Sequence, residues 1–226
     1  MTGRGVLIGN ADCEAGVAVV QAIAREGARL CLHGGSAASL APAREAAAAA
    51  GCAAPELYFG MGAREAVAAA QAGGPVHVAI SVLPPLPAGR LSGLADGDAA
   101  LRSGWTHVTA SAELFQAALP AMTKRGEGRL IFVGPVEAKA MTGRDADVER
   151  AVGIGVLGMM KALSGEVGPH AVTCNSLLWD SLPIGEGRVR ILDGLGAGAA
   201  YFASPLSEFL TGLVIAVDEG RQGGVF

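Results

Sequence analysis

Aromatic residues, long apolar runs and an excess of positive charge are all scarce in this sequence of 226 residues. Aromatics make up 4% of it, and 17 Lys and Arg stand against 21 Asp and Glu, which gives a formal charge of -4. Nucleic-acid-binding domains and membrane-surface proteins present basic patches, so we expect no nucleic acid and no membrane as a partner. The longest apolar stretch after the start, residues 152–160, ends at Lys161 and is too short to span a bilayer.

Patterns of metal ligands and disulfides are also missing. The four cysteines, Cys13, Cys31, Cys52 and Cys174, are scattered, without a CxxC pair and without a histidine at ligand spacing. The N-terminal segment has one arginine before a short apolar run, which does not fit a secretory signal. We therefore expect no metal site and a reduced, cytoplasmic protein.

Small apolar residues are what the sequence has in quantity: 51% of it is hydrophobic, and 34 residues are glycine. Apolar runs alternate with alanine-rich stretches along the whole chain, which predicts seven strands and six helices. The expected strands are 6–8, 29–33, 57–59, 76–83, 129–133, 171–178 and 213–217, and the expected helices are 16–25, 39–50, 64–72, 98–122, 148–167 and 206–209. Such alternation is typical of an α/β fold. We expect a single domain over residues 1–226, with a Rossmann-type, doubly wound parallel sheet of seven strands in the order 3-2-1-4-5-6-7 and helices on both faces.

Several segments resemble the short-chain dehydrogenase/reductase family. Residues 24–30 (AREGARL) are similar to the family's turn from the first helix to the second strand, and residues 116–122 with 128–131 resemble its fifth helix and fifth strand. Residues 172–176 (VTCNS) and 210–220 look like its sixth and closing strands. The order and spacing of these segments extend over nearly the whole chain. The resemblance implies the Rossmann-type fold and, for an intact member, NAD(P)-dependent dehydrogenase or reductase activity.

The family's glycine-rich turn, TGxxxGxG, is degenerate here. Glycine is needed in that turn so that the backbone can approach the cofactor's pyrophosphate. Residues 9–16 read GNADCEAG, in which the positions of interest are Gly9, Asn10, Glu14 and Gly16. A gapless register keeps only Gly16 and places Glu14 where the pyrophosphate should approach, which adds crowding and like charge. A shifted register puts Cys13 and Ala15 at glycine positions, and the crowding remains.

Three other cofactor landmarks of the family are replaced as well. The second strand ends in HGGS, residues 33–36, with neither an acid for a ribose hydroxyl nor an arginine for a 2′-phosphate. Gly60 stands at the position that resembles the adenine-contacting Asp, and residues 81–84 (SVLP) stand where the family has NNAG. We therefore expect no cofactor, and NAD(P) only if the chain is an atypical enzyme.

The family's catalytic set is Asn, Ser, Tyr and Lys, in which Tyr transfers the proton, Lys lowers its pKa and Ser orients the carbonyl. None of the four is found at its expected position. His107 stands near the Asn position, and Pro135, or its neighbour Gly134, stands at the Ser position. The Tyr and Lys positions are taken by Val148 and Val152, or by Glu149 and Gly153 if the register slips by one. We expect no catalytic residues of the family's type.

A cleft is still expected at the carboxyl ends of the strands, where ligands bind in open α/β sheets. Its candidate residues are Ser81, His107, Trp179 and Asp180. Residues 153–158 match GxGxxG, but they lie inside an expected helix and not after a strand, so they indicate close helix packing.

The helix over residues 148–167 carries more large apolar residues than one sheet-facing stripe needs, which predicts a second buried face. In the resembling family this helix and the one before it pair two subunits. We expect an interface made by Val152, Gly155, Val156, Gly158 and Met159.

The preferred prediction is therefore a non-catalytic structural or regulatory subunit of a homo-oligomer, or of a hetero-oligomer with a catalytically active paralogue. One alternative is an NAD(P)-dependent oxidoreductase with an atypical site, in which His107 or Glu149 replaces the tyrosine. A second alternative is a small-ligand binding module.

Overall fold

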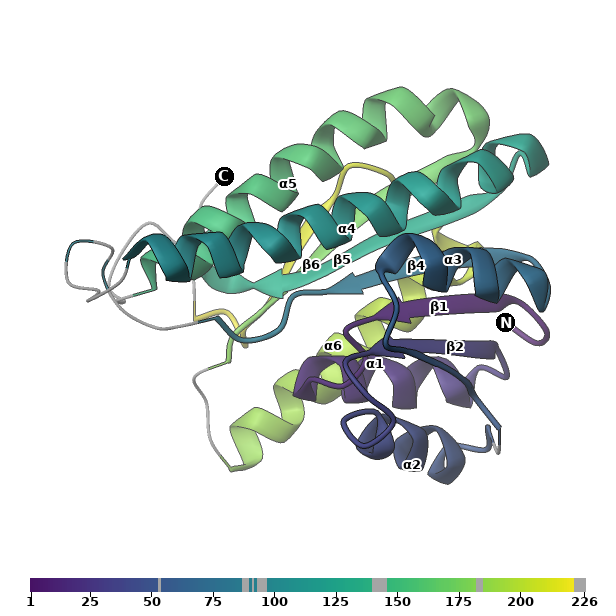
Figure 1. Ribbon diagram of the computed structural model, residues 1–226, viewed down its shortest axis with the longest axis horizontal. Helices are drawn as coiled ribbons and strands as arrows, with labels where there is room; N and C mark the ends of the chain where they lie inside the picture. The colour runs from purple at the N-terminus through teal and green to yellow at the C-terminus, as the bar shows by residue number, and fades with distance from the viewer. Residues whose placement is uncertain are drawn as a thin grey trace.

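The computed structural model describes residues 1–52, 54–86, 90, 92, 97–139, 146–181 and 185–221. In this part of the chain, seven parallel strands form one sheet in the order β3-β2-β1-β4-β5-β6-β7, which confirms the predicted order (Figure 1). The four central strands are β1 (Gly5–Gly9), β4 (Val76–Val82), β5 (Gly128–Pro135) and β6 (Val172–Trp179). Helices cover both of their faces, so nearly every side chain on them is buried, which explains their continuous apolar runs.

The outer strands are shorter or less buried. They are β2 (Arg29–Gly34), β3 (Glu56–Phe59) and β7 (Val214–Val217). β3 and β7 form the two edges of the sheet.

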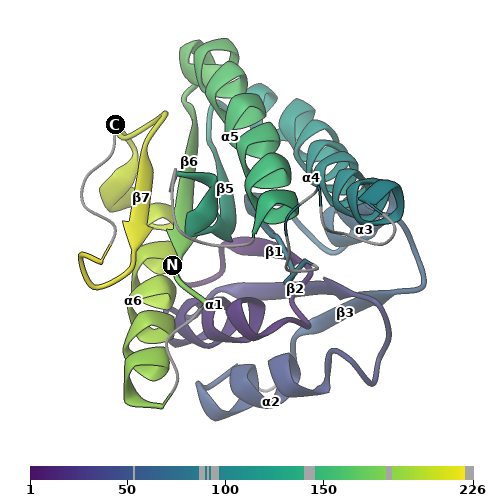
Figure 2. The same cartoon turned by 90° about the vertical axis from the view of Figure 1, so that its left-hand side faces the viewer.

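Two helical layers sandwich the sheet, as Figures 1 and 2 show. One layer holds α1 (Glu14–Arg25), α2 (Ala41–Ala49) and α6 (Glu186–Ala203). The other holds α3 (Ala63–Ala72), α4 (Gly97–Arg125) and α5 (Asp147–Val167). Each layer forms an apolar core with one face of the sheet. Because both faces are covered, a site can form at the carboxyl ends of the strands.

The prediction for the sixth helix is wrong. We expected residues 206–209 to be helical, but the helix is α6 at Glu186–Ala203, and only a 3-10 turn, η4 (Pro205–Ser207), follows it. α6 contains four glycines, each of which lowers helix propensity by about 1 kcal/mol relative to alanine. Tertiary packing offsets that cost, because a Cβ on Gly196 would lie 3.0 Å from both the Ala18 carbonyl oxygen and the Ala22 Cβ of α1.

Candidate functional site

The turn between β1 and α1 keeps two structural features of a glycine-rich turn: a residue with left-handed backbone and a close contact that only glycine allows. Asn10 has φ +55°, the left-handed region that glycine favours, and its side-chain Nδ2 donates to the Val82 carbonyl at 2.7 Å. At Gly16 a Cβ would lie 2.6 Å from the Asn10 carbonyl oxygen, so only glycine fits there. These contacts fit the gapless register, in which Glu14 stands at the second of the three glycine positions.

The carboxylate of Glu14, the first residue of α1, forms an ion pair with an arginine of another helix. Its carboxylate accepts hydrogen bonds from Arg188 of α6, with Nε lying 3.0 Å from Oε1 and Nη2 pairing with Oε2. The Arg188 Cζ lies 4.7 Å from the centroid of the Trp179 ring, at the end of β6. Sequence reasoning missed Arg188 because it lies in the helix that was not expected.

Asp12, in the same turn, is hydrogen-bonded to the loop that follows β2. Its Oδ2 accepts hydrogen bonds from the Gly35 backbone N–H at 2.9 Å and from Ser39 Oγ at 2.7 Å. A Cβ on Gly34 would lie 2.8 Å from the Asp12 Cγ. Asp12 therefore anchors the loop between β2 and α2.

The cavity at the carboxyl ends of β4, β5 and β6 is very small. Its volume is about 20 Å³, roughly the space of one water. Among the described residues its walls are Leu83, Pro84, Pro85, Pro135, Glu149, Trp179 and Ser181.

The two residue pairs considered for the Tyr and Lys positions lie on different faces of α5. Val148 and Val152 are fully buried between α5 and α4, where a Cβ on Gly104 would lie 2.4 Å from Val152 Cγ2. Glu149 instead lines the small cavity, and a Cβ on Gly153 would lie 3.6 Å from Pro135 Cγ and 2.6 Å from the Ala138 Cβ. Glu149 and Gly153 therefore face the cleft, and the site has no room for a larger side chain at position 153.

His107 and Ser81 are linked through a third residue. Ser81 Oγ lies 2.8 Å from Ser111 Oγ, and Ser111 Oγ donates to the His107 carbonyl at 2.9 Å. His107 itself is half-buried on α4, and desolvation lowers the pKa of its imidazole. A lowered pKa keeps the ring neutral near neutral pH.

The other two expected cleft residues are buried. Trp179 forms a wall of the small cavity and carries Arg188 on its ring. Asp180 is completely buried, and its Oδ2 lies 3.8 Å from an Arg221 guanidinium nitrogen. Both side chains are therefore inaccessible to a ligand in this structure.

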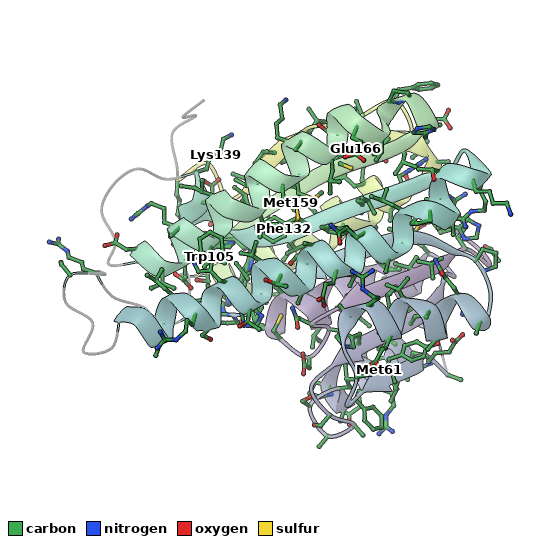
Figure 3. All side chains as sticks on the ribbon, turned by 45° about the horizontal axis from the view of Figure 1, so that its top comes forward. Met61, Trp105, Phe132, Lys139, Met159 and Glu166 are labelled. Atoms are coloured by element: carbon green, nitrogen blue, oxygen red, sulfur yellow. The ribbon has the colours of Figure 1, made fainter. Side chains whose placement is uncertain are left out.

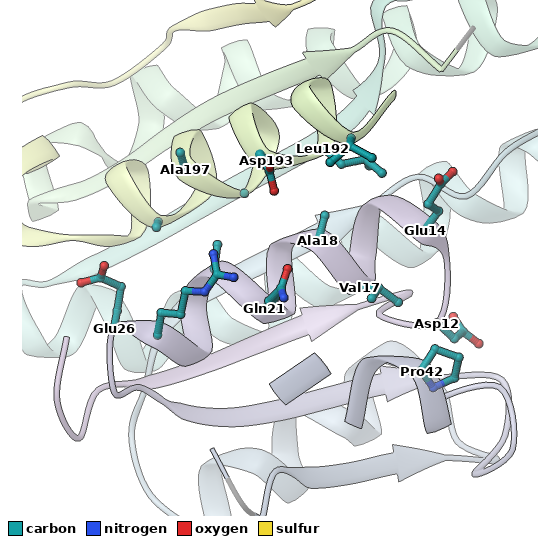
Figure 4. A pocket seen from close by; sticks show the side chains of 15 residues that line it. Asp12, Glu14, Val17, Ala18, Gln21, Glu26, Pro42, Leu192, Asp193 and Ala197 are labelled. Atoms are coloured by element: carbon teal, nitrogen blue, oxygen red, sulfur yellow. The ribbon is translucent and has the colours of Figure 1, made fainter. Parts of the chain in front are cut away.

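Two larger hollows lined by described residues lie elsewhere. One, of about 470 Å³, lies at the ends of β2 and β3 and is lined by Asn10, His33, Gly34, Gly35, Gly60, Met61, Gly62 and Glu65. The larger, of about 820 Å³, is a groove between α1 and α6 with α2 at its side. Figure 4 shows Val17, Ala18 and Leu192 along it, with Asp12 and Glu14 at one end and Glu26 at the other.

The structure corrects the interface expected on α5. Val152 and Val156 are fully buried within the chain, so they belong to the core and are not available to a partner. Gly155 packs against Trp105 of α4, since a Cβ there would lie 3.1 Å from the indole ring, and Gly158 is open to solvent. Figure 3 labels Trp105 on α4 and the partly buried Met159 on α5.

α5 with the turn after it, Asp147–His170, is also apolar and long enough to cross a bilayer by length and composition alone, with a mean hydropathy of 1.2. One face of it packs on the sheet, and 28% of its most apolar 18-residue window is buried. Across the described ranges, no group of three or more His, Cys, Asp and Glu side chains is placed to hold a metal ion.

No protein-family model and no curated protein matches the sequence. Solved structures do match over nearly the whole chain. A candidate short-chain dehydrogenase/reductase from Burkholderia xenovorans has TM-score 0.86 at 20% identity, covering 100% of this chain and 98% of the other. A short-chain type dehydrogenase/reductase from Mycobacterium ulcerans has TM-score 0.83 at 18% identity, covering 98% and 91%. Acetoin dehydrogenase from Salmonella typhimurium has TM-score 0.80 at 18% identity, covering 97% and 96%. The chain therefore has the fold of the short-chain dehydrogenases/reductases.

Proposed function

We propose that this chain is a catalytically degenerate relative of the short-chain dehydrogenases/reductases and acts as a non-catalytic structural or regulatory subunit of a cytoplasmic oligomer. The observation that carries the proposal is that the chain's own side chains contact one another where the resemblance would place the cofactor. Glu14 pairs with Arg188 at the first turn of α1, and Asp12 holds the loop after β2.

The place for chemistry is filled in the same way. Proline stands at positions 84, 85 and 135 around a cavity of about 20 Å³. Of the two pairs considered for the tyrosine and lysine positions, Glu149 and Gly153 are the pair that faces this cavity. Neither glutamate nor glycine can combine a proton donor of phenolic pKa with a neighbouring cation. The cavity bounded by these described residues is too small for a carbonyl substrate beside a nicotinamide ring.

An assembly would cover apolar side chains that the single chain exposes. On α4 and α5, Trp105 is 48% and Ile154 50% exposed, beside the open Gly158. Around η4 and β7, Leu206 is 81% and Phe209 89% exposed. Large apolar side chains gathered on a surface are typical of protein interfaces. The partner is a second copy of this chain or a catalytically intact paralogue, since the same helix face serves both.

Calorimetric titration with NAD, NADH, NADP and NADPH tests the proposal, with an active dehydrogenase of the same fold as the positive control. We expect no saturable binding to this chain under conditions in which the control binds. A dissociation constant like that of the control would overturn the proposal and favour the atypical oxidoreductase. That alternative also requires a substrate-dependent change in the absorbance of reduced nicotinamide.

A second candidate function is a small-ligand binding module, and the groove between α1 and α6 favours it. Its volume of about 820 Å³ lies within the range of small-molecule sites. Native mass spectrometry separates the two functions. A chain that stays monomeric, alone and with an intact paralogue, would reject the subunit and leave the ligand-binding module.

A further inference from the structure

The groove between α1 and α6 is as long as a helix of three turns. Glu14 and Arg25, at the two ends of α1, both line it, so it follows that helix for about 18 Å at 1.5 Å per residue. Its volume is about 820 Å³, and Figure 4 shows α1 and α6 side by side along it. Val189, Asp193 and Ala197 of α6 line it and are exposed, so the groove is open to solvent. Its shape therefore fits an elongated occupant better than a compact small molecule.

The floor of the groove is apolar and consists of small side chains. Where the two helices lie closest, a Cβ on Gly196 would be 3.0 Å from both the Ala18 carbonyl oxygen and the Ala22 Cβ. Val17 and Leu192 lie beside this floor and are partly buried. The distance between packed helices depends on the side chains at their contact, so small residues let a third helix approach both α1 and α6. The groove therefore offers an apolar surface to one face of a helix.

The charge along the groove is negative. Among the described residues that line it there is one guanidinium, that of Arg25, and there are four carboxylates, those of Asp12, Glu14, Glu26 and Asp193. Because Arg188 pairs with Glu14, the carboxylates exceed the cations by two. Glu26 and Asp193 are exposed and form no ion pair within the part of the chain that the structure describes. Charge complementarity therefore favours a basic occupant.

A second copy of this chain does not match the charge of the groove. In a symmetric contact the groove would face the same groove of the other copy, which brings the two sets of carboxylates together. The whole chain also has a formal charge of -4. Because like charges facing each other across an interface oppose binding, the occupant is expected to be a different protein.

We propose that the groove between α1 and α6 is a docking site for a basic amphipathic helix of another protein. A helix of about 12 residues spans the groove. Its apolar stripe, at i, i+3, i+4 and i+7, lies on the floor, and its Lys or Arg side chains reach Asp193 and the carboxylates at both ends. One helix of this length covers less than a standard interface of about 1,600 Å², so the complex should be weak and sensitive to salt.

The inference goes beyond the proposed function. The groove lies on the opposite face of the sheet from α4 and α5, so it can be occupied while those helices pair with another subunit. Docking in it also does not depend on whether the chain binds a nucleotide.

A synthetic peptide labelled with a fluorophore is the probe, and fluorescence anisotropy measures its binding. The peptide has about 14 residues of leucine, alanine and lysine, with the leucines on one helical stripe. We expect one peptide to bind per chain, with an affinity that falls at high salt. Circular dichroism should show a gain of helix on binding, because a peptide of this length is only marginally helical alone. A peptide of the same composition with the leucines scattered should bind at least about tenfold more weakly.

Two substitutions in the groove and two outside it locate the binding. Asp193→Lys and Ala197→Lys place a cation in the groove at exposed positions of α6, which the fold should accept. Each should weaken binding of the striped peptide at least about fivefold, because an attraction is lost or a repulsion is gained. Glu166→Lys on α5 and Ala68→Lys on α3 are the matched controls. They make the same changes of charge at exposed positions on the other face of the sheet and should leave the affinity unchanged.

Several results would overturn the docking site. These are no saturable binding of the striped peptide, equal binding of the scattered peptide, or equal affinity of the wild type, Asp193→Lys and Ala197→Lys. Competition by octylammonium that abolishes peptide binding without any gain of helix would overturn it in favour of a small-cation site. A smaller assembly for Asp193→Lys than for the wild type in native mass spectrometry would overturn it in favour of a second copy. Tight binding of a nicotinamide nucleotide to the wild type would overturn only the proposed function.

Discussion

Replacing Gly158 with leucine should stabilise the single chain and destabilise its assembly. Gly158 lies on the outer face of α5, and no atom outside its own helix lies within 4 Å of the Cβ that a substitution would add. The single chain therefore accepts the leucine without a clash. Since leucine has a better helix propensity than glycine by about 1 kcal/mol, the chain should gain about 2–4 °C in Tm.

In an oligomer built through α4 and α5 the same leucine stands between two helices. Overpacking costs about 1–3 kcal/mol at each site, and a symmetric dimer meets it twice. The total of about 2–6 kcal/mol raises the dissociation constant at least about thirtyfold. Gly155 is unsuitable for this test, because a side chain there meets the Trp105 ring inside the chain.

Sedimentation equilibrium of the wild type, Gly158→Leu and Ala48→Leu measures the effect. Ala48 is an exposed helical residue on α2, on the other face of the sheet, so its leucine variant controls for added apolar surface. Fluorescence of Trp105 in a Trp179→Phe background should shift to the red as the assembly dissociates. An unchanged dissociation constant in Gly158→Leu would refute the interface on α5.

Three further predictions follow from single contacts. Asp12→Ala loses two hydrogen bonds and should lower the free energy of unfolding by about 1–2 kcal/mol in urea titrations, whereas Asp193→Ala, on the exposed side of α6, should not. Desolvation lowers the pKa of His77 and of His107 below the ordinary value of 6.5. Below pH 6.5 the unfolded chain therefore binds more protons than the folded chain, and the free energy of unfolding should fall as the pH is lowered. Replacing both histidines with glutamine should flatten this pH dependence. Burial raises the pKa of the Cys31 thiol to about 12, so it should react with a thiol reagent only after unfolding.

The sheet could be predicted from sequence because its signals are local. Buried parallel strands are continuous apolar runs, and helices between them are amphipathic or alanine-rich, so period and order suffice. α6 escaped prediction because its four glycines weaken the local signal, while its stability comes from packing on α1 at Gly196.

The site could be predicted only where it depends on residue types at known spacings. The sequence showed that glycines, tyrosine and lysine are replaced, but it could not choose between the registers of α5. Which residues of α5 face the cleft depends on Gly104 packing against Val152, and on Gly153 packing against Ala138. The pairing of Glu14 with Arg188 joins residues 174 positions apart, and no local pattern carries such a contact.

Native mass spectrometry of the wild type in an excess of NADH and then of NADPH shows whether the chain assembles without holding a nucleotide. An active dehydrogenase of the same fold serves as the nucleotide-binding control. We expect an assembly whose mass is a whole multiple of the 22.6 kDa chain, or, in a second sample to which an intact paralogue is added, of the chain plus that paralogue. No nucleotide should be held by this subunit in either sample. One nucleotide retained by each copy of this chain, as in the control, would contradict this expectation.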